Sequence, residues 1–311
     1  MDWRQLWQIV SAPDNVPITA LLFLIPFYAW YGLRQSFEND RLIEKLERDP
    51  ELAKTHHRRN FPYQSDWQQE VPVWPYLLRI EFLAVLVVTV ILFVWSITLN
   101  APLEEPSNPN LTMNPSKAPW YFVGLQEMLV YFDPWLAGVV FPTLIILGLL
   151  AIPYLDNNPL GNGYFTFRQR KFSILTFCFG FLGLWVLMVV IGTFLRGPGW
   201  MWFWPGQTWD ANRVVFEGNR DLPDLIGVSS VAGKAVAGAL ALAAYFAIAA
   251  WGVRKLFLGI AFNRKLYARM TLLQTLAFEF FLTTMLLLPV KMMLWHFLRI
   301  KYILVTPWFN V

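Results

Sequence analysis

Three residues within the stretch 114–136 combine an aromatic surface, an open space and an ionisable group. Trp120, Gly124 and Glu127 stand at positions i, i+4 and i+7, so in a helix they share one face. The indole offers a flat apolar surface, the glycine leaves room beside it, and the carboxylate can accept a proton from a bound hydroxyl group. The spacing therefore indicates a pocket for a flat, lipid-soluble ligand with a polar handle.

A short helix over residues 118–132 is expected to carry this face. Pro119 stands near its start, where the fixed backbone angle of proline suits a first helical turn, and the loop before it, 100–119, is rich in proline. Tyr121 and Phe122 add two more aromatic side chains. The helix is too short to cross about 30 Å of hydrocarbon, so we expect it to lie at the membrane interface or to re-enter the bilayer.

The composition indicates a lipid environment for most of the chain. The 311 residues are 56% hydrophobic and 15% charged, against roughly 25% charged in soluble domains. About 20 consecutive apolar residues are needed for a transmembrane helix. The sequence predicts an all-α membrane protein with about six such helices plus the short interfacial helix, and the spans are expected at 16–33, 77–99, 135–155, 172–196, 233–257 and 271–297.

The net charge of +4 is interpreted as a topology signal, because Lys and Arg gather in cytoplasmic loops; we expect no nucleic-acid partner. Basic clusters alternate from loop to loop, and Lys117 is the one basic residue of the 100–134 loop. A multi-pass protein of the cell inner membrane is predicted, with the loops 100–134 and 197–232 and both termini on the electropositive side. The clusters are Arg34, Arg41, Lys45, Arg48, Lys54, Arg58 and Arg59, then Arg168, Arg170 and Lys171, then Arg254, Lys255, Arg264, Lys265 and Arg269.

Residues 114–136 resemble the quinol-oxidation loop of cytochrome b, whose hallmark is Pro-Glu-Trp-Tyr after a stretch that contains Asn-Pro. Trp120 and Tyr121 match this motif, and the likeness extends over roughly 76–207, including Arg196-Gly-Pro-Gly-Trp200. Ala118 and Pro119 stand where the family has Pro-Glu, so the usual proton-accepting carboxylate is missing. Glu127 is the candidate replacement, and the alternative is that Glu127 only forms hydrogen bonds while water or a partner takes the proton.

The resemblance implies a separately encoded C-terminal half of cytochrome b, like subunit IV of bf complexes, in a quinol:cytochrome c reductase. It implies quinol contacts from Pro119, Trp120, Tyr121, Phe122 and Gly124, with menaquinol favoured by the altered motif. It also implies a dimeric multi-subunit complex with a haem-bearing cytochrome b chain, a Rieske iron–sulfur protein and a cytochrome c.

This chain has too few histidines and cysteines to bind haem or an iron–sulfur cluster, so we expect the partner chains to carry these redox groups. Two b haems need two pairs of axial histidines, whereas this chain has only His56 and His57 in the charged loop and His296 at the end of the last span. Cys178 alone builds no disulfide, cysteine-held cluster or covalent haem attachment. We therefore expect no haem or metal ligand here.

The remaining ionisable residues at membrane depth leave alternatives open. Glu279 is interpreted as a bond to a neighbouring helix or as part of a proton path, and Arg79 and Glu81 as structural or as part of a quinone-reduction site. Lys234 and Lys291 are expected to extend their ammonium groups to the membrane surface.

The predicted division of the chain is 1–75, 76–210 and a C-terminal extension at 211–311. The alternative function is a polytopic transporter or assembly scaffold, although the internal pseudo-symmetry that many transporters have is not evident.

Overall fold

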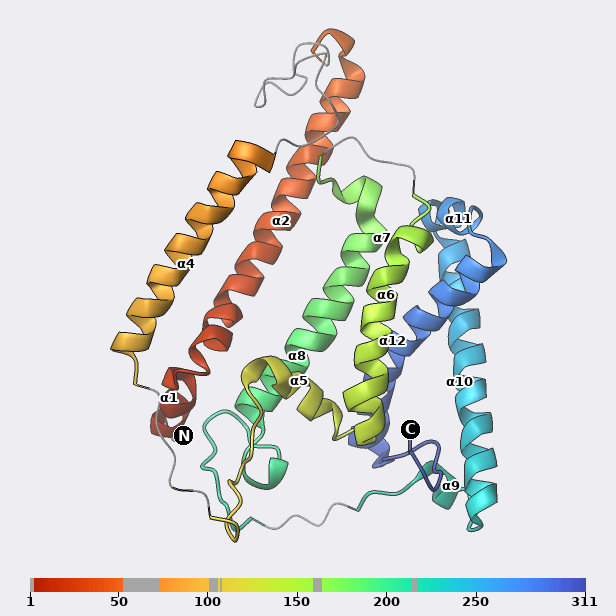
Figure 1. The fold of residues 1–311 in the computed structure, drawn as a ribbon. Helices are drawn as coiled ribbons and strands as arrows, with labels where there is room; N and C mark the ends of the chain where they lie inside the picture. The colour runs from red at the N-terminus through yellow and green to blue at the C-terminus, as the bar shows by residue number, and fades with distance from the viewer. Residues whose placement is uncertain (1–2, 53–72, 101–105, 107, 159–163, 214–217) are drawn as a thin grey trace. The chain divides into compact units, whose positions relative to one another are not determined.

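The protein is described from a computed structural model that covers residues 3–52, 73–100, 106, 108–158, 164–213 and 218–311. These residues form helices and loops without a named strand, and six helices are long and apolar enough to cross a membrane (Figure 1). The prediction of an all-α membrane protein with six spans is confirmed. The spans are α2 (Val16–Arg48), Val73–Thr98, Leu136–Leu155, Phe167–Leu195, α10 (Val231–Gly259) and α12 (Leu272–Leu298).

Three of the spans contain short irregular turns. Val73–Thr98 joins η1 (Val73–Leu77) to α4 (Leu78–Thr98), and Leu136–Leu155 joins η2 (Leu136–Val140) to α6 (Phe141–Leu155). The fourth span is built from α7 (Phe167–Phe177), η3 (Cys178–Val186), α8 (Leu187–Val190) and η4 (Ile191–Leu195). The hydrophobic runs located every span after the first to within several residues, whereas the first helix continues well past the predicted end at residue 33. Apolar runs locate spans because the bilayer requires every backbone polar group to be paired inside the helix.

The chain divides into two compact units, which are described separately: residues 10–111 with 164–168, and residues 1–9 with 112–163 and 169–311. In the first unit, α2 continues without a break to Arg48. The spacing of Leu42, Ile43 and Leu46 predicts an amphipathic helix that begins near Phe37 and ends near Pro50. In the structure this segment is the continuation of the first span and not a separate element. Ion pairs one turn apart, Arg34–Glu38 at 2.8 Å and Glu44–Arg48 at 2.5 Å, support its polar end. His56 and His57 lie outside the described residues.

The second unit packs α5 (Trp120–Met128) against α8 and η4, and packs α12 between α6 and α10. Thr271 starts α12 with a capping box formed with Gln274, and the Ser230 side chain caps α10 by accepting a hydrogen bond from the backbone of Gly233. The short α1 (Trp3–Ser11), η5 (Pro198–Trp200), α9 (Leu222–Leu225) and α11 (Ala261–Tyr267) lie in or beside the connections.

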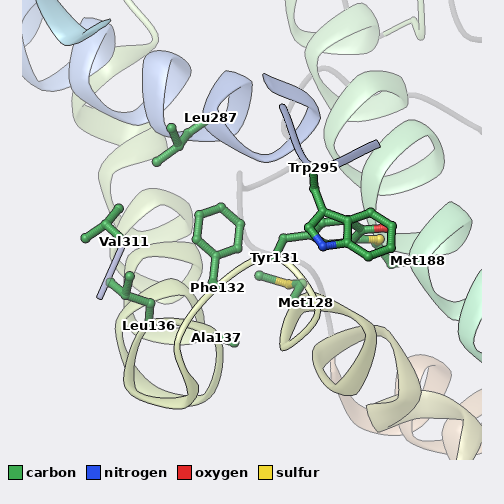
Figure 2. Close-up of a cluster of buried hydrophobic side chains, with 9 residues drawn as sticks. All are labelled: Met128, Tyr131, Phe132, Leu136, Ala137, Met188, Leu287, Trp295 and Val311. Carbon is green, nitrogen blue, oxygen red and sulfur yellow. The ribbon is translucent and has the colours of Figure 1, made fainter. Parts of the chain in front are cut away.

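The main core of this unit joins segments from both halves of the sequence (Figure 2). Tyr131 and Phe132, which follow α5, have no exposed surface. The ring of Trp295 from α12 meets Tyr131 edge-on, with 5.8 Å between centroids. The other members of the cluster are Met128, Leu136, Ala137, Met188, Leu287 and Val311.

The chain turns back after α12, where Arg299 adopts a left-handed conformation (φ 56°). Residues 299–302 then pair with 220–222 through backbone hydrogen bonds, among them Arg220 N to Arg299 O at 3.0 Å and Leu222 N to Tyr302 O at 2.8 Å. Leu304 lies against α10 at Gly238, where a Cβ atom would come within 2.5 Å of the Leu304 Cα. The end of the chain is thus folded back onto the segment before α9 and onto α10.

Candidate functional site

The helix α5 has one buried and one exposed face. Val123, Gly124, Glu127 and Met128 are buried against the fourth span, which confirms that Gly124 and Glu127 share a face. Trp120 is half-buried at the start of the helix. Tyr121 and Phe122 are 50% and 55% exposed, so their aromatic rings are free to contact a ligand, lipid or partner.

Glu127 lies at the centre of a buried hydrogen-bond network. Its side chain is 0% exposed, and that of Arg196 is 2% exposed. Arg196 donates from Nη2 to Glu127 Oε1 at 2.7 Å and from Nε to Oε2 at 2.9 Å. Tyr131 donates to Oε1 at 3.1 Å, and the Trp200 indole donates to Oε2 at 3.0 Å. The carboxylate therefore accepts four hydrogen bonds from three side chains.

The end of the fourth span places Arg196 and Trp200 in this network. The helix stops at Leu195, and Arg196 is extended and forms a bridge with Trp202. Gly199 turns the chain with a positive φ of 64°, a conformation that glycine adopts without strain. The remaining guanidinium nitrogen, Arg196 Nη1, donates to the Trp200 carbonyl at 3.1 Å. One tight turn thus supplies two of the donors to Glu127.

Sequence reasoning missed the role of Arg196. The stretch 196–200 resembles cytochrome b, but this likeness does not identify Arg196 as the partner of Glu127. An arginine directly after a long apolar span was the available signal, because a charge at membrane depth needs a partner.

Aromatic rings from the C-terminal extension and from the turn after Arg196 enclose the ion pair. The Arg196 Cζ atom lies 5.5 Å from the ring centroid of Trp202 and 6.0 Å from that of Trp295, within the range of cation–π attraction. His296 has its ring 4.7 Å from Trp295 and 6.2 Å from Tyr131. The extension at 211–311 therefore contributes directly to the surroundings of Glu127.

The phenol of Tyr131 stays protonated and able to donate in this environment. Burial raises the pKa of Tyr131 well above its usual value, and the neighbouring Glu127 charge raises that pKa further.

The space expected beside Gly124 is filled by the fourth span. A Cβ atom at Gly124 would lie 3.0 Å from Val189 Cγ2, and one at Gly192 would overlap the side chain of Val123. Gly124 and Gly192 therefore allow α5 and the fourth span to approach closely. This close approach brings the Glu127 carboxylate into contact with Arg196. A contact of Gly124 with a quinol stays a prediction.

An open hollow of about 500 Å³ lies beside the network, on the side of the 114–116 loop. Arg196, Trp200 and Lys301 line it, together with Gln126, Leu129 and Val130. Pro119, Trp120, Tyr121, Phe122 and Gly124 do not line it. Their contacts with a quinol stay predictions, as does proton acceptance by Glu127.

Two other ionisable residues of the spans pair with oppositely charged side chains within the chain. Glu279 is 5% exposed and pairs with Arg254, with Nε to Oε1 at 3.0 Å and Nη2 to Oε2 at 3.1 Å, and the Tyr267 hydroxyl also donates to it. This is the bond to a neighbouring helix that the structural interpretation of Glu279 required. Lys234 pairs with Asp224 at 2.5 Å.

The expectation that Lys291 reaches the membrane surface is wrong. Its side chain is buried and donates to the backbone carbonyl of Lys301, and its ammonium lies over the rings of Phe132 and Tyr302. The returning segment after Arg299 covers it.

No cluster of three or more His, Cys, Asp or Glu side chains suited to a metal occurs among the described residues.

Together, the fold and the network define a multi-pass helical membrane protein with a buried Glu–Arg pair under a short aromatic helix. Residues 106–200 match the family model described as cytochrome b (C-terminal)/b6/petD. The matched segment contains α5, Glu127, Arg196 and Trp200, and it confirms the resemblance predicted from the sequence over these residues, although not over the wider range that includes α4. No solved structure matches the chain. The match supports a cytochrome b/b6-type subunit of a bc or b6f complex.

Proposed function

We propose that this chain is a membrane subunit of a bc-type quinol:cytochrome c reductase and forms part of its quinol-oxidation site on the electropositive side of the cell inner membrane, where both termini lie. The observation that carries the proposal is the buried Glu127–Arg196 pair, which holds the motif helix α5 on the fourth span within the matched segment. A pair with both partners buried fixes the helix that bears Trp120, Tyr121 and Phe122 in one position.

The exposed aromatic face of α5 is proposed to be this chain's wall of the quinol pocket. Tyr121 meets Trp120 edge-on with 5.7 Å between ring centroids. Its ring is tilted against that of Phe122, with 4.9 Å between centroids. Pro119 sits at the start of the helix in an extended conformation, and Gly124 sets how closely the helix approaches the fourth span. Such a surface suits the ring of a lipid-soluble quinol, with menaquinol as the proposed substrate.

Glu127 is proposed to accept a proton released on quinol oxidation. Both of its oxygens are engaged by Arg196, so proton uptake requires that part of this ion pair opens, with the proton taking the place of one guanidinium bond. Arg196 can then keep its bond to the Trp200 carbonyl. Glu127→Gln removes the proton-accepting group and keeps the shape, so we expect loss of quinol turnover by about 10²–10⁴-fold. Wild-type turnover in this variant would end the proposal for Glu127.

The electrons are proposed to leave through partner chains. A quinol gives up two electrons, and the proposed acceptors are the iron–sulfur cluster of a Rieske protein and the b haems of a cytochrome b chain, with a cytochrome c beyond them in a dimeric complex.

The test of the proposed function is an optical redox spectrum of the gently solubilised complex after addition of menaquinol, with and without an inhibitor of the quinol-oxidation site. Inhibitor-sensitive reduction of co-purified b-type haem is the expected result. An intact complex without haem would overturn the proposal and favour a transporter or an assembly scaffold.

A further inference from the structure

The region that joins α10 to α12 carries five exposed basic side chains. They come from the last turns of α10, from α11 and from the turn that follows α11, and they are Arg254, Lys255, Arg264, Lys265 and Arg269. No Asp or Glu occurs in residues 225–278 of the sequence. This end of the two spans therefore has a large excess of positive charge.

An ion pair neutralises only one of these five charges. In the part of the chain that the structure describes, Arg254 pairs with Glu279, and the other four have no carboxylate within ion-pair distance. Arg264 donates from Nε to a backbone carbonyl of α10 at 3.1 Å, and the Lys255 ammonium lies 5.9 Å from the ring centroid of Trp251. Neither a carbonyl group nor an aromatic ring cancels a positive charge, so the charge remains available to an external anion.

The other two basic clusters of the chain contain carboxylates. At the polar end of α2, acidic residues alternate with the basic ones and form two ion pairs one turn apart. At α7, Arg170 pairs with Asp156 at 2.7 Å. A cytoplasmic location requires basic residues but does not require that their charges stay unpaired. The unpaired charge around α11 is therefore a property that the topology of the chain does not explain.

The fold holds this charge at the end of α10. The helix α11 packs against α10 (Figure 1), with Leu266 buried and with Arg264 and Lys265 exposed. The Tyr267 hydroxyl accepts a hydrogen bond from Arg254 Nε at 3.2 Å, which ties the end of α11 to the span. The basic side chains of α11 are thus presented outward from a fixed position.

Exposed apolar side chains adjoin the basic ones. Trp251, Leu256 and Ile260 lie on or directly after the last turns of α10 and are exposed. The end of a membrane-spanning helix lies at the level of the lipid headgroups, where a tryptophan and basic residues are typical neighbours. The surface therefore combines positive charge for a phosphate group with apolar area for acyl chains, and a phospholipid with a net negative charge matches both.

We propose that residues 251–269 bind an anionic phospholipid. Its headgroup phosphate lies among the basic side chains around α11, and its acyl chains run along the exposed face of α10. The predicted cytoplasmic position of this loop places it at the leaflet with a negative surface. The site lies outside the segment that matches the cytochrome b family model, and the inference does not depend on quinol oxidation.

The test is lipid binding to the delipidated complex that contains this chain, measured by native mass spectrometry with phosphatidylglycerol and phosphatidylcholine as probes. The triple variant Lys255→Gln, Lys265→Gln, Arg269→Gln removes three of the four unpaired charges. Each basic residue at an anionic lipid surface contributes about fivefold in affinity. We therefore expect phosphatidylglycerol to bind this site about 100-fold more weakly in the variant, so that each copy of the chain loses one tightly bound molecule. Phosphatidylcholine binding should not change.

A charge-retaining variant separates loss of charge from damage to the fold. Lys255→Arg, Lys265→Arg, Arg269→Lys changes the same three side chains and keeps every positive charge, so it should bind phosphatidylglycerol as the wild type does. Loss of the lipid from this variant as well would overturn the proposal, because the charge would then not be what holds the lipid.

A matched control removes three basic residues from the balanced cluster at the end of α2. Arg41→Gln, Lys45→Gln, Arg48→Gln lowers the net charge by the same amount and should keep the bound phosphatidylglycerol. An equal loss in this control, or wild-type binding in the triple glutamine variant of the α11 region, would overturn the proposal. Loss of a partner subunit from that variant, with phosphatidylglycerol still bound, would also overturn it and identify an acidic protein surface as the partner.

Discussion

Two clusters in the same unit use the same three residue types in different surroundings. Glu127 binds Arg196 and Tyr131, and Glu279 binds Arg254 and Tyr267. In the first cluster both charged side chains are buried, at 0% and 2% exposure. In the second, Glu279 is 5% exposed, whereas Arg254 is 48% exposed.

The two clusters differ in what surrounds the arginine: protein groups surround Arg196, whereas solvent reaches Arg254. Arg196 is almost fully shielded from solvent, and the Trp200 carbonyl and the faces of Trp202 and Trp295 surround it. Arg254, near the end of α10, can extend toward water and lipid head groups. A buried pair is costly to break because the remaining charge stays unpaired, whereas an exposed pair contributes little. The Glu127–Arg196 pair should therefore hold α5 rigidly in position, whereas the Glu279–Arg254 pair should act as an ordinary contact between two helices.

The largest expected effect comes from removal of the arginines. Arg196→Met leaves Glu127 buried without its counter-charge and should lower the free energy of unfolding by about 3–5 kcal/mol. Arg254→Met should lower it by about 1 kcal/mol or less, because solvent screens that pair. Thermal unfolding of the two purified variants measures the difference. Equal losses would show that burial does not separate the clusters.

Much of the helical structure that carries these two clusters could be predicted from the sequence. The six spans follow from apolar runs, since the bilayer permits few other structures. The shared face of Gly124 and Glu127 follows from helical spacing, but the packing of that face against the fourth span does not.

The partners of the charged residues could not be predicted in the same way. The Glu127–Arg196 bond joins positions far apart in the chain, and no local pattern encodes such a contact. The error on Lys291 has the same origin, since the left-handed turn at Arg299 brings later residues back over its ammonium group. The continuation of α2 was missed because its polar end lacks an apolar run, although ion pairs one turn apart maintain the helix there.

A smaller effect is expected from packing beside each cluster. Gly192→Ala would place a methyl group on the side chain of Val123 and near its carbonyl, and should destabilise the protein by about 1–3 kcal/mol. Gly252 in α10, close in sequence to Arg254, has open space within 4 Å of the position that a methyl group would take, so Gly252→Ala should be neutral or slightly stabilising. Melting temperatures of the two variants provide the test. A stable Gly192→Ala protein would mean that α5 is not held tightly on the fourth span.

The smallest expected effect separates hydrogen bonding from charge within the two clusters. Tyr131→Phe removes one donor to Glu127 Oε1, but Arg196 Nη2 still binds that oxygen at 2.7 Å. The loss should therefore be about 1 kcal/mol, as for a single buried hydrogen bond, and well below that of Arg196→Met. Tyr267→Phe should cost less again, because Arg254 remains on both oxygens of Glu279 and is open to solvent. If Tyr131→Phe destabilised the protein as much as Arg196→Met in the same unfolding measurement, the hydrogen-bond network and not the buried charge pair would be what fixes α5.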